Sequence, residues 1–409
     1  AKSGGRKNMD ENLPVIRISV RNLVEFILRE GDIDNRTGGG QDPENMQMGS
    51  RIHRKIQRQM GSDYQAEVPL KTEIVCDGFT LKIEGRADGL IHTKEQVMVD
   101  EIKGVLRELD RVQEPAGIHL AQAKCYASMV AEQEGADEIG VQMTYCQMET
   151  EEVKRFQYSY QSNELKVWFD EVIRQYEKWA KFQIEWRKAR NASIKGIEFP
   201  FPYRKGQREL AVSVYRTILR KKKLFIQAPT GVGKTISTVF PAVKAVGEEL
   251  GEKIFYLTAK TITRTVAEQA FETLREQNLK FKVITLTAKE KICFCEETSC
   301  NPDDCPYAKG HFDRVNDAVY ELLMQEDVMS REVLEAQARK HKVCPFEMAL
   351  DVSTWVDGVI CDYNYVFDPD ARLRRFFAEG GAGGYLFLID EAHNLVERGR
   401  QMYLSLIHI

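Results

Sequence analysis

A glycine-rich run that ends in lysine and threonine could bind the phosphates of a nucleotide. It reads Ala228-Pro229-Thr230-Gly231-Val232-Gly233-Lys234-Thr235, which fits the Walker A pattern with alanine in place of the first glycine. Glycine lets backbone N–H groups approach a phosphate closely, lysine holds the β- and γ-phosphates, and threonine ligates Mg²⁺. We expect five residues to bind ATP: Thr230, Gly231, Gly233, Lys234 and Thr235.

A pair of carboxylates could supply the rest of that chemistry. Asp390 and Glu391 directly follow the apolar run 386–389. Asp390 would hold Mg²⁺, directly or through water, and Glu391 would polarise the attacking water. With Lys234 they form the expected catalytic set for hydrolysis of the nucleotide.

A third set of residues has the composition of a phosphodiester-cleaving site. Asp88 and Glu101 would hold Mg²⁺ or Mn²⁺, and Lys103 would orient or activate water and stabilise the developing charge. Glu101 and Lys103 are two residues apart, so their side chains share one face of a strand.

The cysteines suggest a metal rather than disulfides. There are nine, an odd number, and six of them fall between residues 293 and 361. Cys293, Cys300, Cys305 and Cys344 follow the spacing C-x6-C-x4-C-x38-C. Four thiolates are what a [4Fe–4S] cluster needs, and Cys295 could replace Cys293. The tight CxxC pairs of zinc ribbons are missing, and zinc or no metal are the alternatives.

Hydrophobic periodicity indicates the elements that position these residues. Strands are expected over 79–91, 96–103, 139–148 and 153–160, and helices over 49–60, 118–134 and 163–191. Prolines at 200 and 202 then mark a linker. Beyond it, strands over 224–228, 253–259 and 282–287 alternate with helices from Lys234 and over 263–277, and the rhythm resumes at 358 and 385. This alternation predicts an α/β fold with a parallel sheet.

The C-terminal motifs resemble those of the XPD/DinG-type iron–sulfur DNA helicases of superfamily 2. The resemblance covers residues 200–400 and includes the sequence DEAH at 390–393, the segments 203–207, 258–261 and 361–365, and the position of the cysteines between them. It implies that Gln207 reads adenine, that 258–261 contacts the DNA backbone, and that the four cysteines hold a [4Fe–4S] cluster. It also implies translocation along single-stranded DNA, 5′ to 3′, and unwinding of duplex DNA.

The N-terminal motifs resemble those of the RecB-type PD-(D/E)XK nucleases. His53 on an early helix and Gln122 and Tyr126 on a later one agree with Asp88, Glu101 and Lys103 in order along the chain. The resemblance implies that His53 is a further metal ligand and that Gln122 and Tyr126 support the site. The i, i+4 spacing puts Gln122 and Tyr126 on one helix face.

Length and resemblance together predict the domain organisation. At ~150 residues per domain, 409 residues correspond to two or three domains. We expect a nuclease-like domain over 1–195, a RecA-like helicase lobe over 196–292 and 345–403, and an iron–sulfur insert over 293–344. Residues 404–409 resemble the translation of a sequencing-library adapter, so we expect a longer natural chain with a second motor lobe.

Composition restricts the remaining possibilities. The formal net charge is −4, so nucleic acid must bind to local basic patches such as 201–235, which has nine Lys and Arg against one acid. No apolar run approaches ~18 residues and the N-terminus has no apolar signal core, so we expect a cytoplasmic protein without a membrane partner. Single-stranded or branched DNA is the expected partner. The alternatives are a nucleotide-gated nuclease without strand separation and a catalytically inactive DNA-binding adaptor.

Overall fold

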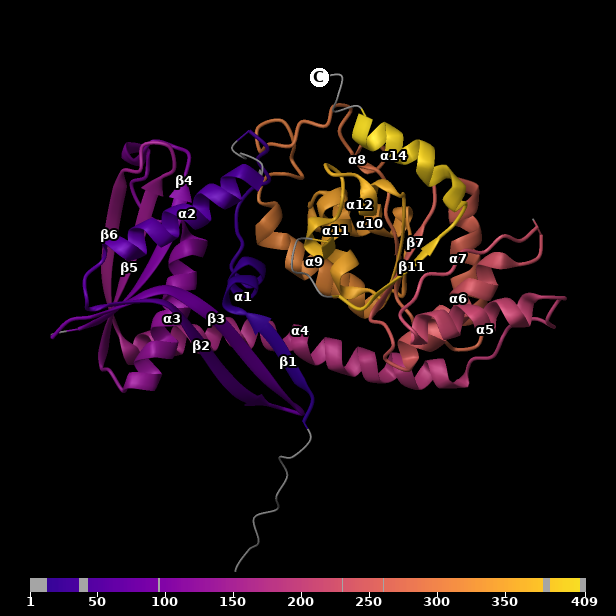
Figure 1. Cartoon of the computed structure of the whole chain (residues 1–409), viewed down its shortest axis with the longest axis horizontal. Coiled ribbons are helices and arrows are strands. Elements are labelled where there is room, and N and C mark those ends of the chain that lie inside the picture. The colour runs from indigo at the N-terminus through magenta and orange to yellow at the C-terminus, as the bar shows by residue number, and fades with distance from the viewer. Residues whose placement is uncertain are drawn as a thin grey trace, which may run out of the picture. The chain divides into compact units, whose positions relative to one another are not determined.

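The computed structural model describes residues 13–36, 43–94, 96–229, 231–259, 261–377 and 383–404. The chain divides into two compact units, residues 1–184 and 185–409, each with its own β-sheet (Figure 1). Thr230 and the suspected foreign residues 405–409 lie outside the described residues. Within the described part of the chain, no helix has the length and apolarity needed to cross a bilayer.

Unit 1 contains a six-stranded mixed sheet. Its strands are β1 (Val15–Ser19), β2 (Tyr64–Cys76), β3 (Phe79–His92), β4 (Val97–Val105), β5 (Glu138–Gln147) and β6 (Val153–Gln161). The order is β1-β3-β4-β5-β6, and β2 also pairs with β3. The β1–β3 and β4–β5 pairs are parallel, and the β2–β3, β3–β4 and β5–β6 pairs are antiparallel. The four strands expected in this half of the sequence are thus confirmed, with β4 ending two residues later than expected.

One edge of β3 is shared by two partners. β1 pairs with the first part of β3, up to the Ser19–Glu84 pair, and β4 pairs with its last part, from the Gly89–Asp100 pair onward. Asp88 therefore lies where the ladder on this edge is interrupted. Because β4 leaves β3 after Asp100, the backbone N–H of Ile102 needs another acceptor, and it donates to Asp88 Oδ2 at 2.7 Å. The interruption in pairing makes room for a carboxylate inside the sheet.

The helices of unit 1 cover this sheet. They are α1 (Val20–Ile27), α2 (Pro43–Gln59), the 3₁₀ turn η1 (Leu109–Arg111), α3 (Gly117–Glu134) and the first part of α4 (Ser162–Gly196). Ile52 and Ile56 of α2 pack with Ile102 of β4 in a small apolar cluster. On α4, the ring of Trp179 meets Phe26 edge to face with centroids 4.8 Å apart. The aromatic face of α4 is thus partly core of unit 1.

Unit 2 contains a five-stranded sheet in which every pair is parallel. Its strands are β7 (Lys253–Leu257), β8 (Val283–Thr285), β9 (Val328–Met329), β10 (Gly358–Cys361) and β11 (Tyr385–Ile389), in the order β11-β7-β10-β8-β9. All five residues of β7 are buried, as expected for a strand covered on both faces. The mixed α/β class with a parallel sheet is confirmed.

The helices of unit 2 connect these strands. They are α5 (Gln207–Leu219), α6 (Lys234–Gly247), α7 (Thr261–Arg275), α8 (Lys289–Ile292), α9 (His311–Gln325), α10 (Arg331–His341), α11 (Pro345–Trp355), α12 (Asn364–Phe367), α13 (Arg374–Phe377), η2 (Ala392–Asn394) and α14 (Leu395–Leu404). The segment 293–344, expected to be an insert, contributes β9 to the main sheet through its pairing with β8.

The expected strand over 224–228 is wrong. Residues 222–229 have no regular secondary structure, and Phe225 is 90% exposed. The segment pairs with none of the five described strands, so its apolar side chains gain no burial. An apolar run forms a buried strand only if the edge of a sheet is free to pair with it. Periodicity alone does not identify such an edge.

The last turns of α4 belong to unit 2, so the division falls before residue 195. Ile194 is buried in the apolar cluster of unit 2. Asp357 accepts from Arg190 NH1 and from Trp186 Nε1, both at 2.8 Å, and the side chains of Arg190 and Asp357 are 8% and 4% exposed. Because α4 is continuous, no turn residue in the sequence marks the point where the helix passes from unit 1 to unit 2.

Candidate functional site

The backbone of the phosphate loop of unit 2 accepts hydrogen bonds from three side chains. These belong to Lys234, which follows the loop, to Gln207, the first residue of α5, and to Arg204 just before α5. Gly231 and Gly233 have φ of +81° and +75°, which glycine adopts without strain. Lys234 begins α6 and its Nζ donates to the carbonyl of Ala228 at 3.2 Å. Lys234 thus contacts the backbone of its own loop, and it is expected to bind the phosphates of the nucleotide.

Gln207 lies beneath this loop. Its Nε2 donates to Val232 O at 2.7 Å, and its Oε1 accepts from Arg204 N at 2.8 Å. Arg204 NH1 also donates to Gly231 O at 2.6 Å. A Cβ on Gly233 would lie 2.4 Å from Gln207 Nε2, so a larger residue there would displace this amide and strain a backbone whose φ is +75°. The amide expected to read adenine is thus engaged with the loop.

The carboxylates lie at the carboxyl end of β11, beside β7. Asp390 N donates to Leu257 O at 3.0 Å, and Asp390 Oδ1 accepts from Glu391 N at 3.0 Å. Glu391 has a φ of +49°, an uncommon value for a residue with a side chain. The buried Tyr363 donates to the carbonyl of Asp390 and holds this turn from beneath.

Tyr256 links the two nucleotide motifs. Burial raises the pKa of its hydroxyl, the charge of Asp390 raises it further, and a hydrogen bond with Thr235 opposes the shift. The hydroxyl therefore contacts the expected Mg²⁺ ligands of both motifs. Sequence reasoning missed Tyr256. The signal was its place one residue before the carboxyl end of a buried strand, the edge where ligands bind parallel sheets.

The residues expected to form the nuclease site converge in unit 1 from four elements. His53 of α2 lies 3.3 Å from Asp88 of β3, measured from Nδ1 to Oδ1. Lys103 of β4 donates from Nζ to Glu101 Oε1 at 2.9 Å and to Gln122 Oε1 of α3 at 3.2 Å. Tyr126, one turn after Gln122, interacts with that amide and with Glu101. The six residues thus form two contacting groups, one of His53 and Asp88 and the other of the remaining four, which influence each other through their charges.

Burial and like charge perturb one carboxylate of this site, that of Glu101. Burial raises the pKa of Glu101 to about 7, and the charge of Asp88 adds to the effect against the opposing charge of Lys103. The pKa of His53 is raised because its hydrogen bond with Asp88 and the negative charge of Asp88 together outweigh burial, which is the largest single influence and lowers it. Glu101 Oε2 is buried without a hydrogen-bond partner among the described residues.

The carboxylate next to Glu101 serves a different purpose. Asp100 points to the other face of β4, where it accepts from Thr144 Oγ1 at 2.6 Å and from Tyr64 at 3.1 Å. Sequence reasoning placed Glu101 and not Asp100 with Lys103, as strand alternation requires. It missed Gln57, which donates to the carbonyl of Asp88 at 3.0 Å and lies one turn after His53 on the same helix.

Whether the side chains of this site suit a metal ion depends on Glu101 Oε2, the buried oxygen without a hydrogen-bond partner among the described residues. Within the ranges that the structure describes, no group of three or more His, Cys, Asp or Glu side chains is arranged to hold a metal ion. Carboxylate oxygens are nevertheless the ligands that Mg²⁺ and Mn²⁺ prefer, and the partnerless Glu101 Oε2 beside Asp88 is an oxygen that a cation would satisfy. The donor chemistry fits a divalent cation.

The cysteines of 293–344 form two groups. Cys295 Sγ lies 3.7 Å from Cys305 Sγ, and Cys293 interacts with Cys295. Cys300 and Cys344 interact with each other beside Lys289. All described cysteines are free thiols, so the donor chemistry fits an iron–sulfur cluster or zinc. Cys295, the alternative to Cys293, lies among the other candidates.

Comparison with known proteins finds similarity in the C-terminal half. Residues 208–294 match the family model described as DEAD/DEAH box helicase, and residues 258–408 match the model described as DEAD_2. The region 208–408 is therefore similar to helicases of the DEAD/DEAH-box type.

Two relatives and one solved structure illustrate the likeness. The chain is 22% identical over 251 residues to the human "Regulator of telomere elongation helicase 1", which covers 49% of this chain and 20% of that protein. It is 20% identical over 226 residues to the XPD helicase subunit of "General transcription and DNA repair factor IIH" of Dictyostelium discoideum, covering 49% of this chain and 29% of that protein. A structure of an "XPD_Helicase" is 20% identical with a TM-score of 0.33, covering 48% of this chain and 34% of that one. The chain thus spans less than a third of either relative.

Proposed function

We propose that unit 2 is the nucleotide-binding lobe of an ATP-dependent DNA helicase that acts in DNA repair or defence. The observation that carries this proposal is the position of Asp390 at the carboxyl end of β11, where its N–H donates to Leu257 O of β7 at 3.0 Å, while the neighbouring Tyr256 interacts with both Asp390 and Thr235. It brings a hydroxyl and a carboxylate from two distant motifs to one point at the carboxyl edge of a parallel sheet. A hard cation prefers such oxygen ligands, and this edge is where phosphates bind in α/β folds.

Each residue of this site has a distinct role in the proposal. Lys234 binds the β- and γ-phosphates after it releases Ala228 O, and the backbone around Gly231 and Gly233 contacts the phosphate oxygens. Thr235 and Asp390 hold Mg²⁺, which when bound neutralises charge on the phosphates. Glu391 orients and polarises the attacking water.

Nucleotide binding tests this proposal directly. A fluorescent ATP analogue titrated into the purified 409-residue chain with Mg²⁺ should give a saturable signal that unlabelled ATP competes away. Absence of competition by ATP would overturn the proposal. Strand separation, with the 5′ to 3′ direction proposed by resemblance, is measured on the natural protein if its gene extends beyond this sequence.

We also propose that unit 1 is a metal-dependent DNA nuclease of the PD-(D/E)XK type. The observation in its favour is the buried Glu101, one of whose oxygens faces Lys103 while the other has no partner among the described residues. Such an oxygen is costly unless a ligand satisfies it.

The residues of unit 1 divide the work of phosphodiester hydrolysis. Asp88, Glu101 and His53 hold Mg²⁺ or Mn²⁺, which when bound lowers the pKa of water and supplies a nucleophile. Lys103 stabilises negative charge on the phosphate oxygens, and Gln122 and Tyr126 hold Lys103 and Glu101 in place. Water attacks phosphorus, a P–O bond breaks, and the departing alkoxide takes up a proton.

Cleavage of labelled single-stranded DNA with Mn²⁺, and its suppression by EDTA, tests the nuclease proposal. Intact substrate with either Mn²⁺ or Mg²⁺ would overturn it and favour the inactive adaptor. Cleavage that responds to ATP on DNA that is never unwound would favour the nucleotide-gated nuclease.

For the cysteine segment we propose a [4Fe–4S] cluster held by Cys300, Cys305, Cys344 and either Cys293 or Cys295. Its role would be structural. Protein purified without oxygen should be brown and contain iron and sulfide in equal amounts. A colourless preparation with one zinc per chain would overturn this assignment.

A further inference from the structure

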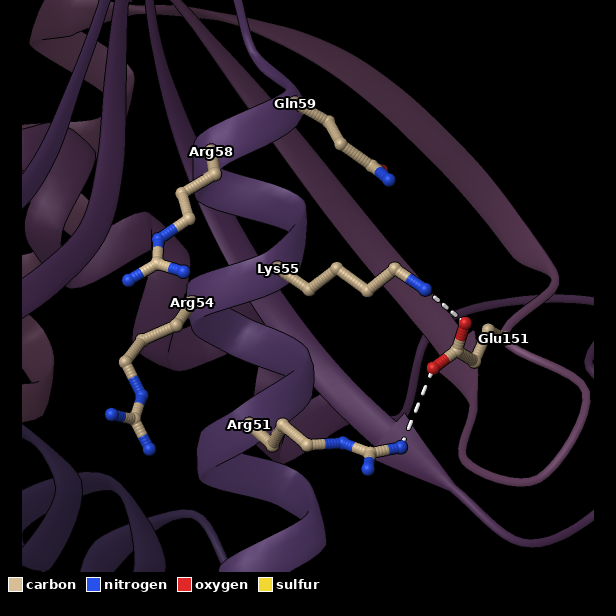
Figure 2. Close-up of a pocket in the computed structure, with 6 residues that line it drawn as sticks. All are labelled: Arg51, Arg54, Lys55, Arg58, Gln59 and Glu151. Carbon is tan, nitrogen blue, oxygen red and sulfur yellow. Dashed lines mark hydrogen bonds and ion pairs between the residues drawn. The ribbon is translucent and has the colours of Figure 1, made fainter.

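Helix α2 exposes four cations on one face. Arg51, Arg54, Lys55 and Arg58 follow the spacing i, i+3, i+4, i+7, and all four are exposed. With Gln59 and Glu151 they line a hollow of about 550 Å³ on the surface of unit 1 (Figure 2). No role in the nuclease chemistry has been given to these residues.

The same helix carries the nuclease site along a neighbouring stripe. Ile52 and Ile56 face the core, whereas His53 and Gln57 reach Asp88. At 3.6 residues per turn, Arg54 and Arg58 lie next to the stripe of His53 and Gln57 on the side away from the core. An anion bound to these two arginines would lie beside the metal-ligand candidates.

Glu151 pairs with only two of these four cations. It lies in the turn between β5 and β6 and pairs with Arg51 at 3.5 Å and with Lys55. Figure 2 shows Arg54 and Arg58 pointing away from Glu151. Arg54 donates from Nε to Ser50 O at 3.3 Å, and no partner of Arg58 is found in the described ranges. These two guanidinium groups form an uncompensated pair.

We propose that Arg54 and Arg58 bind the phosphodiester backbone of single-stranded DNA and direct it toward the site of Asp88 and Glu101, an inference that rests on the proposed nuclease function. The guanidinium fork matches phosphate geometry. The hollow contains no aromatic side chain on which a base could stack, so contact is with the backbone and independent of sequence. Arg51 and Lys55, held by Glu151, keep the helix in place.

The test uses the full chain in EDTA, where no cleavage occurs, and a photoactivatable oligonucleotide that contains 4-thiothymidine. Crosslinked peptides are mapped by mass spectrometry, which separates binding at α2 from binding in unit 2. In R54Q/R58Q the crosslink yield within residues 49–60 should fall by about tenfold, since two phosphate contacts are lost. The variant R54K/R58K, which keeps both charges, should retain most of the yield.

The matched control is K166Q/R174Q on α4. It also removes two positive charges from the exposed surface of unit 1. Lys166 pairs with Glu132, and Arg174 pairs with Glu171. Its crosslink yield at α2 should equal that of the unaltered chain. Circular dichroism and thermal unfolding confirm that each variant is folded.

Several results would overturn this inference. These are equal yields at α2 in R54Q/R58Q and in the control, crosslinks confined to unit 2, and preferential crosslinking of an RNA oligonucleotide of the same sequence. A separate cleavage assay with Mn²⁺ distinguishes the two proposals. If crosslinking at α2 depends on the arginines while the unaltered chain never cleaves DNA, the binding surface stands and the nuclease proposal fails.

Discussion

The two candidate sites differ in what holds them together. In unit 1, side chains from four elements contact one another directly, and a buried carboxylate lies at their centre. In unit 2, the phosphate loop is held through backbone groups, and Lys234 folds back onto Ala228 O. A site built from side chains on paired strands is assembled by packing. A site built around a backbone loop is ready for its ligand only after an anion has replaced hydrogen bonds within the loop, such as the one from Lys234 to Ala228 O.

The largest effect is expected from Lys103→Ala, which tests the side-chain site. Cleavage of single-stranded DNA with Mn²⁺ should fall by about a thousandfold, because the developing phosphate charge loses its partner. Initial rates on a labelled oligonucleotide measure this loss. Lys71→Ala, an exposed lysine on β2, serves as the control and should cleave like the unaltered chain. Full activity of Lys103→Ala would mean that the network is structural.

The backbone site is tested by Lys234→Ala. Affinity for ATP should fall by about a hundredfold, because one charge-assisted contact to the phosphates is lost. The rise in unfolding temperature on addition of Mg·ATP should then disappear. DNA cleavage should remain unchanged, because this lysine belongs to the other unit. Undiminished ATP affinity in this variant would contradict its assigned role.

The pH dependence of stability sharpens the comparison, because the pKa of Glu101 in unit 1 is raised to about 7. Glu101 has a folded-state pKa of about 7 against an ordinary value of 4.5, so the folded state holds the proton more tightly. Its contribution to stability is complete at low pH and is lost as pH rises from about 4.5 through 7. In EDTA, Glu101→Gln should therefore be more stable than the unaltered chain at alkaline pH, by about 3 kcal/mol.

Urea unfolding at several pH values measures this difference, which should shrink toward pH 4.5. Glu108→Gln, which alters an exposed carboxylate, should show no such trend. Added Mn²⁺ should reverse the order of stability, because the amide is a poorer ligand than the carboxylate. A pH-independent difference in EDTA would mean that Glu101 titrates as an ordinary acid.

The smallest effect is expected from Tyr256→Phe, which removes only a hydroxyl. Affinity for Mg·ATP should fall by about fivefold, in line with the loss of one hydrogen bond that positions Thr235 and Asp390. Affinity for ATP without Mg²⁺ should stay the same. An equal loss with and without Mg²⁺ would indicate that the tyrosine supports the loop generally.

The sequence specified more of unit 1 than of unit 2. Alternation along β4 put Glu101 and Lys103 on one face, and the structure has them in contact. The apolar run 224–228 was misleading because burial depends on which strand is available beside it. Tyr256 was missed because its role depends on a neighbour 134 positions later in the chain, Asp390, which only the β7–β11 register brings close.

The buried pair of Arg190 and Asp357 determines where the polypeptide can be divided into separately produced pieces. A helicase lobe that began at residue 196, as the prolines suggest, would leave Asp357 buried without its guanidinium and indole partners. Removing one member of a buried ion pair costs about 3–5 kcal/mol, a large share of the stability of a domain. The expression boundary therefore lies before Glu185, inside a continuous helix, where no turn or linker marks it.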